Sequence, residues 1–226
     1  MLNINDIYVL VQNLVNKYKQ GYVSPDEFNG FFNLAQNQYF NDLIGLPDQY
    51  QQGYPLPAVG KLYNQTMQDK LSPFFTPITV TLPGNSQVIK PTDMGSPINI
   101  ILPGGVNCGI RPENKFVGFL TDSIDAPSIT APFAIDNGAY YQVYPVTGWP
   151  VGTSYVLNYY KTPPDSKWAY TLDANGLPVY DPSNSTQPIW RNNEYSDLIS
   201  KTCTLIGANL ANNQIVQNAQ LQQKEG

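Results

Sequence analysis

The sequence predicts an α+β protein in which helices from both ends of the chain form a bundle around an inserted antiparallel β-sandwich or barrel. Apolar residues recur at helical spacing near both termini, and short alternating stretches with dense Gly and Pro punctuation fill the middle. The expected parts are residues 1–72 for the N-terminal part of the bundle, 73–187 for the β domain with a hairpin, and 188–226 for a closing helix plus a tail.

The first expected helix runs from Asn3 to Lys19. Its apolar residues share one stripe, which consists of Ile7, Leu10, Val11, Leu14, Val15 and Tyr18. Gly21 follows as a helix end, and the short loop after it predicts an antiparallel pairing with the next helix.

The best-marked helix lies within residues 21–47. Ser24 is a preferred N-cap residue, Pro25 suits the first helical position, and Glu27 has the spacing of a capping box. Gly45, with a proline two residues on, ends the helix. Its apolar stripe consists of Phe28, Phe31, Phe32, Ala35, Tyr39 and Leu43. Burial of this stripe contributes on the order of 10 kcal/mol before entropy is counted.

The other side of this helix has amide side chains where a solvated helix usually has charges. These amides are Asn29, Asn33, Gln36, Asn37 and Asn41. Three large apolar residues, Leu34, Phe40 and Ile44, lie off the main stripe and are the expected subunit-interface residues. The face therefore meets either a second subunit or another part of the same domain, and the sequence leaves both open.

A third helix is expected over residues 58–71, and the character of the chain changes from Pro73. The expected strands are Ile78–Leu82 with Gln87–Lys90 as its hairpin partner, Ile98–Leu102, Phe116–Thr121, Tyr140–Val146 and Ser154–Tyr160. A further hairpin is expected from Trp168–Leu172 and Leu177–Tyr180 around an Asn-Gly turn.

Helix returns at the C-terminus, where Asn192 or Asn193 is the expected cap. The stripe of this helix consists of Tyr195, Leu198, Ile199, Thr202, Ile206 and Leu210. Residues 212–222 predict a second, poorer helix before a charged tail.

The composition is poor in charge. Charged residues make up 13% of the 226 residues, against about 25% in typical soluble domains. Such a composition suits a component of a large assembly, and it also fits a secreted β-rich binding protein. The net charge of −5 argues against tight binding to nucleic-acid backbones, which requires clustered Lys and Arg.

The chain has no His, which removes Ser–His–Asp and Cys–His catalysis and His-ligated metals. Cys108 and Cys203 lie in separate segments and cannot form a zinc site alone. They are expected to be free thiols in a reducing compartment, with a disulfide between them as the weaker alternative. The Gly-rich stretch around Cys108 is interpreted as a turn between strands, since no base is present to activate the thiol. We therefore expect no enzyme, no cofactor and no metal. The N-terminus lacks a basic signal-peptide region and no apolar run is long enough for a membrane span, so a cytosol-like setting without membrane association is expected.

Two other kinds of site are considered, a carboxylate pair for glycoside cleavage and an aromatic surface for stacking on a ligand. Carboxylate pairs such as Asp122 with Asp125, or Asp173 with Asp181, suit glycoside cleavage only if the fold brings them together. A run of aromatic residues is suited either to stacking on sugars or single-stranded bases or to filling a β core and its interfaces, and the second reading is preferred. That run consists of Tyr140, Tyr141, Tyr144, Trp149, Tyr155, Tyr159 and Tyr160.

Several segments resemble a known family. YVSPDEFNGFFNLAQNQYFNDLIG resembles the helical hairpin of the adaptor proteins that form the ring under the portal of tailed phages, and is most similar to structural ring proteins of crAss-like phages. WAYTLDANGLPVYDPSNSTQPIW and EYSDLISKTCTLIGANLANNQIVQNA resemble the hairpin and the closing helix of the same proteins, and QDKLSPFF fits the entrance to their β domain. The stretch from Gly95 to Pro150 does not match.

The resemblance implies a virion structural protein similar to head-to-tail connectors of the tail tubular protein A type. Such proteins form a dodecameric ring in the phage neck, contact the portal, neighbouring copies and other ring, tail or fibre proteins, and line the channel for genomic DNA. An acidic lumen would let DNA slide without specific binding. The tail with Ile215, Val216 and Leu221 is the expected portal-docking segment. The expected localisation of the protein is the neck or tail of the virion, which is assembled in the host cytoplasm. The alternative is a carbohydrate-binding module of a phage tail or capsid appendage, built on Trp149 and the surrounding tyrosines.

Overall fold

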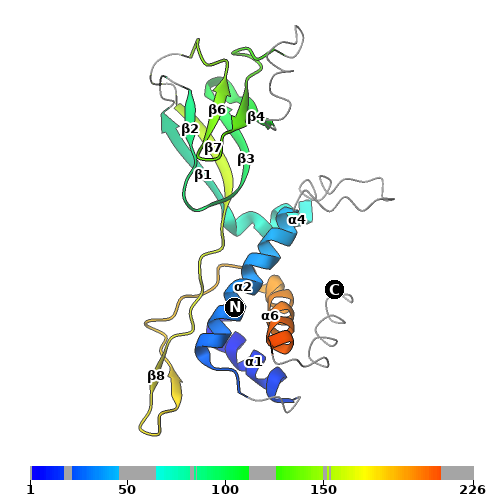
Figure 1. Cartoon of the computed structure of the whole chain (residues 1–226), viewed down its shortest axis with the longest axis vertical. Helices are drawn as coiled ribbons and strands as arrows, with labels where there is room; N and C mark the ends of the chain where they lie inside the picture. Colours follow the sequence, from blue (N-terminus) through cyan, green and yellow to red (C-terminus); the bar gives the residue numbers. More distant parts are fainter. Residues whose placement is uncertain are drawn as a thin grey trace, which may run out of the picture. The chain divides into compact units, whose positions relative to one another are not determined.

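The structure, a computed structural model, describes residues 2–17, 22–45, 65–81, 84, 86–111, 126–149, 152 and 154–209. These residues form a mixed α+β protein with two compact units (Figure 1). The helical unit comprises Met1–Pro73 and Pro163–Gly226, and the β unit comprises Phe74–Thr162. The expected boundaries grouped the hairpin near residue 175 with the β domain, whereas it belongs to the helical unit.

The helical unit contains the helices α1 (Ile4–Lys17), α2 (Pro25–Ile44), α4 (Gln65–Leu71) and α6 (Tyr195–Asn209), with a short 3₁₀ turn η4 (Asn192–Glu194) before α6. Both α1 and α2 pack against α6, and α4 contacts α2. The expected antiparallel pairing of the first two helices is wrong, because α1 and α2 do not pack side by side along their length. They meet at an edge-to-face contact between the rings of Tyr8 and Phe28, whose centroids are 5.0 Å apart.

The sequence signals that define α2 are confirmed. Ser24 accepts a hydrogen bond from the N–H of Glu27, and the Glu27 carboxylate accepts one from the N–H of Ser24, so the capping box is complete. Gly45 ends the helix with a positive φ of 71°, and its N–H donates to the carbonyl of Asn41. Of the expected stripe, Phe31 is only half-buried and the other five residues are buried.

Two details of the other helices differ from expectation. Leu10, which was expected on the apolar stripe of α1, is exposed. Tyr8, which was not expected there, is buried because its ring stacks on Trp168. Neither Asn192 nor Asn193 caps the C-terminal helix. Both lie inside the η4 turn, whose N-cap is Arg191, so the chain enters α6 through a tighter 3₁₀ turn. The described part of the expected third helix is α4, and residues 58–64 and 212–222 lie outside the described residues.

The β unit is one curled, mostly antiparallel sheet. Its strands are β1 (Phe75–Thr81), β2 (Gln87–Ile89), β3 (Met94–Leu102), β4 (Val106–Arg111), β5 (Phe133–Asp136), β6 (Tyr140–Tyr144) and β7 (Ser154–Lys161). Their order in the sheet is β1-β7-β3-β4-β5-β6-β2, and only the β4–β5 pair is parallel. The expected strand at 116–121 lies outside the part of the chain that the structure describes.

The expected hairpin between residues 78–82 and 87–90 is wrong. Strand β1 pairs with β7, and β2 pairs with β6. Ser86, just before β2, is held by β6 and the segment after it: its carbonyl accepts from the N–H of Val143, and its hydroxyl donates to the carbonyl of Val146 at 2.8 Å. Long-range pairing thus overrides the local turn signal, and Pro77 is tolerated because β1 is an edge strand.

The interior of the β unit is filled by side chains from β2, β3, β4, β5, β6 and β7. They are Val88, Ile100, Leu102, Cys108, Ala134, Tyr141, Val143, Tyr155, Leu157 and Tyr159. Several residues of the aromatic run therefore belong to the core, as the preferred interpretation expected. The Gly-rich stretch before Cys108 is a short 3₁₀ turn, η2 (Pro103–Gly105), between β3 and β4, which confirms its structural reading.

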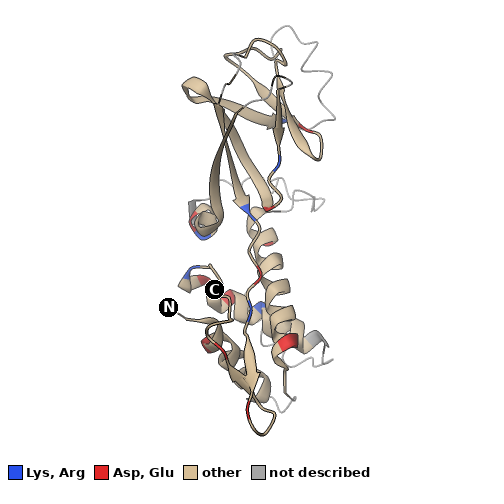
Figure 2. Cartoon of the chain, turned by 90° about the vertical axis from the view of Figure 1, so that its left-hand side faces the viewer, with Lys and Arg blue, Asp and Glu red and all other residues tan. Residues whose placement is uncertain are grey.

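A long segment from Pro163 to Trp190 returns along the helical unit and contains the expected hairpin, β8 (Tyr170–Leu172) and β9 (Pro178–Tyr180). Gly176 in its turn has a φ of 76°, a conformation that glycine adopts without strain. Charged residues are sparse along the ribbons of both units (Figure 2). Among the described residues, no helix is long and apolar enough to cross a membrane.

Candidate functional site

The amide side chains of α2 bind another segment of the same unit. The sequence left open whether this face contacts a second subunit or its own domain, and for Asn29 and Asn33 the contact is within the domain. Asn29 donates from Nδ2 to the carbonyl of Trp168 (3.1 Å) and accepts at Oδ1 from the N–H of Trp168 (2.7 Å). Asn33 makes the same pair of bonds with Ser166, at 3.0 and 2.9 Å. Two asparagines one helical turn apart thus act like the edge of a strand toward every second residue of an extended segment. We call this pair the asparagine clamp.

Gln36 continues the same row. Its Nε2 donates to the Asn33 Oδ1 (2.9 Å) and to the Ser166 hydroxyl (3.2 Å), and its Oε1 accepts the indole N–H of Trp190 at 3.1 Å. Trp190 is fully buried, and its ring lies 5.1 Å from that of Tyr39. This part of the amide face is therefore an internal contact of the helical unit.

The three expected interface residues of α2 are placed differently from one another. Leu34 has 46% of its surface exposed, whereas Phe40 has 2% exposed and lies in the core of its own unit. Ile44 is half-buried at the end of the helix. Only Leu34 is thus freely available to a neighbour. The expected portal-docking residues Ile215, Val216 and Leu221 lie outside the described residues.

The β8–β9 hairpin presents several exposed aliphatic side chains of the helical unit. Leu172 and Leu177 are 64% and 61% exposed, and Val179 is exposed on the neighbouring strand. We call these three residues the hairpin surface. The base of the hairpin is anchored by Trp168, which stacks on Tyr8 at 4.2 Å and on Tyr170 and Tyr180 at 5.9 and 5.7 Å. A hairpin held at its base with apolar side chains toward its tip is suited to contact another protein.

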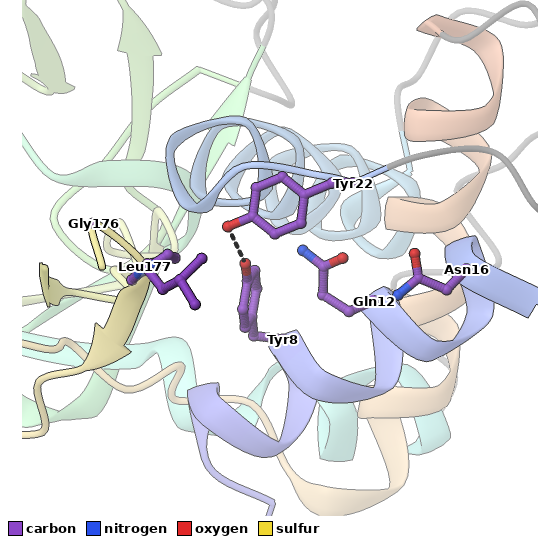
Figure 3. A pocket seen from close by; sticks show the side chains of 7 residues that line it. Tyr8, Gln12, Asn16, Tyr22, Gly176 and Leu177 are labelled. Carbon is purple, nitrogen blue, oxygen red and sulfur yellow. Dashed lines mark hydrogen bonds between the residues drawn. The ribbon is translucent and has the colours of Figure 1, made fainter. Parts of the chain in front are cut away.

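A pocket of about 600 Å³ lies between the hairpin turn and one face of α1 (Figure 3). We call it the tyrosine pocket, and it is lined by Tyr8, Gln12, Asn16, Tyr22, Gly176, Leu177 and Pro178. The residues from α1 are spaced four apart and so share one face of the helix. The sequence analysis did not select them, although this spacing of polar residues was a signal for them. Among the described residues that line the tyrosine pocket, none is charged.

Hydrogen bonding in the tyrosine pocket is incomplete. The Tyr8 hydroxyl lies 3.5 Å from that of Tyr22 and 3.4 Å from the Val23 carbonyl, both at the long end of the hydrogen-bond range. The Gln12 Nε2 donates to the Val23 carbonyl, but the buried Gln12 Oε1 has no partner among the described atoms. An unpaired buried acceptor costs about 1–3 kcal/mol. Burial raises the pKa of Tyr8, so its hydroxyl stays neutral.

A second group of polar side chains joins the helices α2, α4 and α6 and the η4 turn. The Tyr39 hydroxyl donates to the carboxylates of Glu194 and Asp197, the latter at 3.0 Å. Lys70 of α4 lies 3.0 Å from the Tyr39 hydroxyl, 3.0 Å from the Glu194 carboxylate and 3.7 Å from that of Asp197. Burial, followed by the bond to Glu194 and the two negative charges, raises the pKa of Tyr39 far above its usual value. This group, the Lys70 cluster, fixes α4 to α2 and α6 and has a structural role.

Trp149, on which the carbohydrate alternative depends, is half-buried and packs against the core of the β unit. Its indole N–H donates to the carbonyl of Pro145 at 2.7 Å. Because part of the ring is covered and its polar atom is occupied, little of it remains to stack on a sugar.

The remaining candidate catalytic groups show no catalytic arrangement. Cys108 and Cys203 are both free and buried, and burial raises the pKa of each thiol to about 12. Asp173 and Asp181 are each bound within their own turns, where hydrogen bonds from nearby backbone and Asn side chains lower their pKa values. A general acid requires the opposite shift. Asp122 and Asp125 lie outside the described residues.

Metal ligands are not grouped in the described ranges, which contain no cluster of three or more Cys, Asp or Glu side chains able to hold an ion. Comparison with known proteins does not supply a family. No model of a protein family matches the chain, and no match is found among curated proteins.

Proposed function

We propose that this chain is a virion structural protein that forms a ring in the neck of a tailed phage, joins the portal to the tail and lines the DNA channel. In this proposal the helical bundle closed by both chain ends is the ring-forming body, and the inserted β-sandwich or barrel receives the next component. The sequence resemblance described above is the origin of the proposal. Its partners are the portal protein, neighbouring copies, and other ring, tail or fibre proteins.

The observation that most supports the proposal is the hairpin surface. Leu172, Leu177 and Val179 remain in water in the isolated chain although Trp168 anchors the hairpin below them. Covering them in an assembly would gain roughly 25 cal/mol for each Å² of apolar area removed from water. Exposed Leu34 adds a further apolar contact on α2.

Charge is the second support. The net charge of −5 and the 13% content of charged residues suit a subunit that has extensive protein contacts and does not bind DNA tightly. The amides Asn29, Asn33 and Gln36 form hydrogen bonds within the helical unit, so part of the low content of charged residues is explained without a neighbouring subunit. The exposed apolar residues therefore support the proposal more directly than the composition does.

Analytical ultracentrifugation of the purified chain, alone and mixed with the portal protein of the same particle, tests the proposal. We expect a species several times the 25.1 kDa of the chain in at least one of the two samples. A double variant, Leu172→Asp with Leu177→Asp, should shift that species toward the monomer. The matched control adds the same two charges at exposed amide positions away from the hairpin, Asn13→Asp with Asn192→Asp. A monomer in both samples would refute the connector.

The portal-docking segment is tested separately. Deletion of residues 212–226 should abolish co-sedimentation with the portal, because the apolar residues Ile215, Val216 and Leu221 are removed. The far-ultraviolet circular dichroism of the helical unit should remain. Unchanged attachment of the truncated chain to the portal would show that docking lies elsewhere.

A further inference from the structure

The tyrosine pocket has the chemistry of a ligand site, and the argument for it does not depend on the connector proposal. Its size falls within the range of about 300–1,000 Å³ that is usual for small-molecule sites. Two phenol side chains, two carboxamides and the apolar surface of Leu177 and Pro178 surround it. Such a mixture of apolar walls and a few polar groups is typical of a binding pocket.

The strongest single indication is the buried amide of Gln12. The residue is only 9% exposed, its Nε2 is bound to the Val23 carbonyl, and its Oε1 lacks a donor. Turning the amide over would place an oxygen against the Val23 carbonyl, so the present orientation is the better one. A ligand that offers a hydroxyl or N–H donor to Gln12 would pair an acceptor that the described residues leave unpaired.

We propose that the tyrosine pocket binds a neutral saccharide ring. None of the described lining residues is a Lys, Arg, Asp or Glu, so none of them would balance the charge of an ionic ligand. A sugar hydroxyl both donates and accepts, which suits the Gln12 oxygen, the Asn16 amide at the exposed edge and the two tyrosine hydroxyls together. The C–H face of the ring would pack against Tyr22, whose side chain is 62% exposed.

Entry of the ligand requires a small local change, because the Gln12 oxygen is shielded from solvent. Tyr22 is the lining side chain best able to move. It precedes α2, is largely exposed, and its hydroxyl is 3.5 Å from that of Tyr8. Figure 3 shows the two hydroxyls facing each other beside the Gln12 amide. Rotation of the Tyr22 ring would exchange this weak contact for stacking on the sugar.

The test uses the full chain and a panel of neutral sugars: glucose, galactose, mannose, N-acetylglucosamine and their disaccharides. Saturation-transfer NMR identifies a bound sugar, and isothermal titration calorimetry measures its affinity. We expect at least one sugar to bind. Gln12→Leu and Tyr22→Ala should each weaken it about tenfold or more, as expected for the loss of one good hydrogen bond or stacking contact.

Matched controls separate this site from other surfaces. Asn13→Leu alters an exposed amide next to Gln12 on α1, and Phe75→Ala removes an exposed aromatic ring from the β unit. Both variants should bind within about twofold of the unaltered chain, and circular dichroism should show that all variants are folded. The proposal is overturned if no sugar of the panel binds, or if binding survives Gln12→Leu and Tyr22→Ala. It is also overturned if Trp149→Ala abolishes binding while Gln12→Leu does not. None of these results bears on the assembly state, so the connector proposal is judged independently.

Discussion

The asparagine clamp gives the sharpest prediction, because it joins two distant parts of the helical unit through identical pairs of bonds. Replacing Asn33 by Ala removes the two bonds to the backbone of Ser166 and the bond that the Asn33 oxygen accepts from Gln36. The N–H and carbonyl of Ser166 then lose their partners in a part-buried segment. At a net 0.5–1.5 kcal/mol for each backbone bond, the loss is about 1–3 kcal/mol. Alanine offsets about 0.5 kcal/mol of this through its better helix propensity, so we expect a net destabilisation of about 0.5–2.5 kcal/mol.

The assay is urea unfolding followed by circular dichroism at 222 nm, which reports on the helices of the helical unit. The midpoint should fall while the slope with urea stays constant, because the area exposed on unfolding hardly changes. Asn29→Ala should behave in the same way, since Asn29 makes the same two bonds to Trp168. The two losses should be less than additive, because release of the segment at one asparagine weakens its hold at the other.

Asn37→Ala is the matched control for this measurement. Asn37 is an exposed amide on the same helix, so its replacement should stabilise the protein by a few tenths of a kcal/mol through helix propensity alone. If Asn29→Ala and Asn33→Ala both stay within about 0.5 kcal/mol of this control, the clamp does not contribute to stability and the reasoning fails.

Three further predictions concern other parts of the chain. Ser24→Ala should lower the free energy of unfolding by about 1 kcal/mol through loss of the capping box, and an unchanged urea midpoint would contradict this. Because the pKa of Tyr39 is raised in the folded state, its contribution to stability is complete below pH 10, the ordinary tyrosine value, and is lost as the pH rises above it. The free energy of unfolding of Tyr39→Phe should therefore fall less steeply between pH 10 and 11, by up to about 1.4 kcal/mol for each pH unit. Equal slopes for the two proteins would exclude this role. Cys108 and Cys203 should stay unreactive toward a disulfide reagent at neutral pH until urea unfolds the chain, and rapid labelling of the native protein would refute the burial of these thiols.

The sequence predicted helix α2 well because the interactions that begin, end and orient it are local. The capping box of Ser24 and Glu27, the glycine at 45 and the apolar periodicity of α2 all act within a few residues. The hairpin of β8 and β9 was predicted for the same reason, since its turn contains an Asn-Gly pair. The β1–β2 hairpin failed because the partner of β1 is β7, more than seventy residues away, and no local signal specifies such a pairing.

The candidate sites were less predictable than the fold. Phe40 was selected for an interface because it lies off the main stripe, but contacts on a second side of α2 bury it. The tyrosine pocket depends on the return of the hairpin turn to α1, about 165 residues later in the chain, and the sequence does not show this proximity. The four-residue spacing of Tyr8, Gln12 and Asn16 was visible, yet it is equally typical of a solvated helix face.

The amide face of α2 shows why composition alone is weak support for an assembly. An amide-rich, charge-poor helix indicates contact with another surface, and here part of that surface is the backbone of residues 166 and 168 of the same chain. A side-chain amide suits this task, because it offers one donor and one acceptor to the two groups of a peptide unit, whereas Lys or Glu offers only one kind. The same helix therefore needs no neighbour to explain Asn29, Asn33 and Gln36. Leu172 and Leu177 are a better reason to expect a neighbour, because their apolar side chains are more than half exposed among the residues that the structure describes.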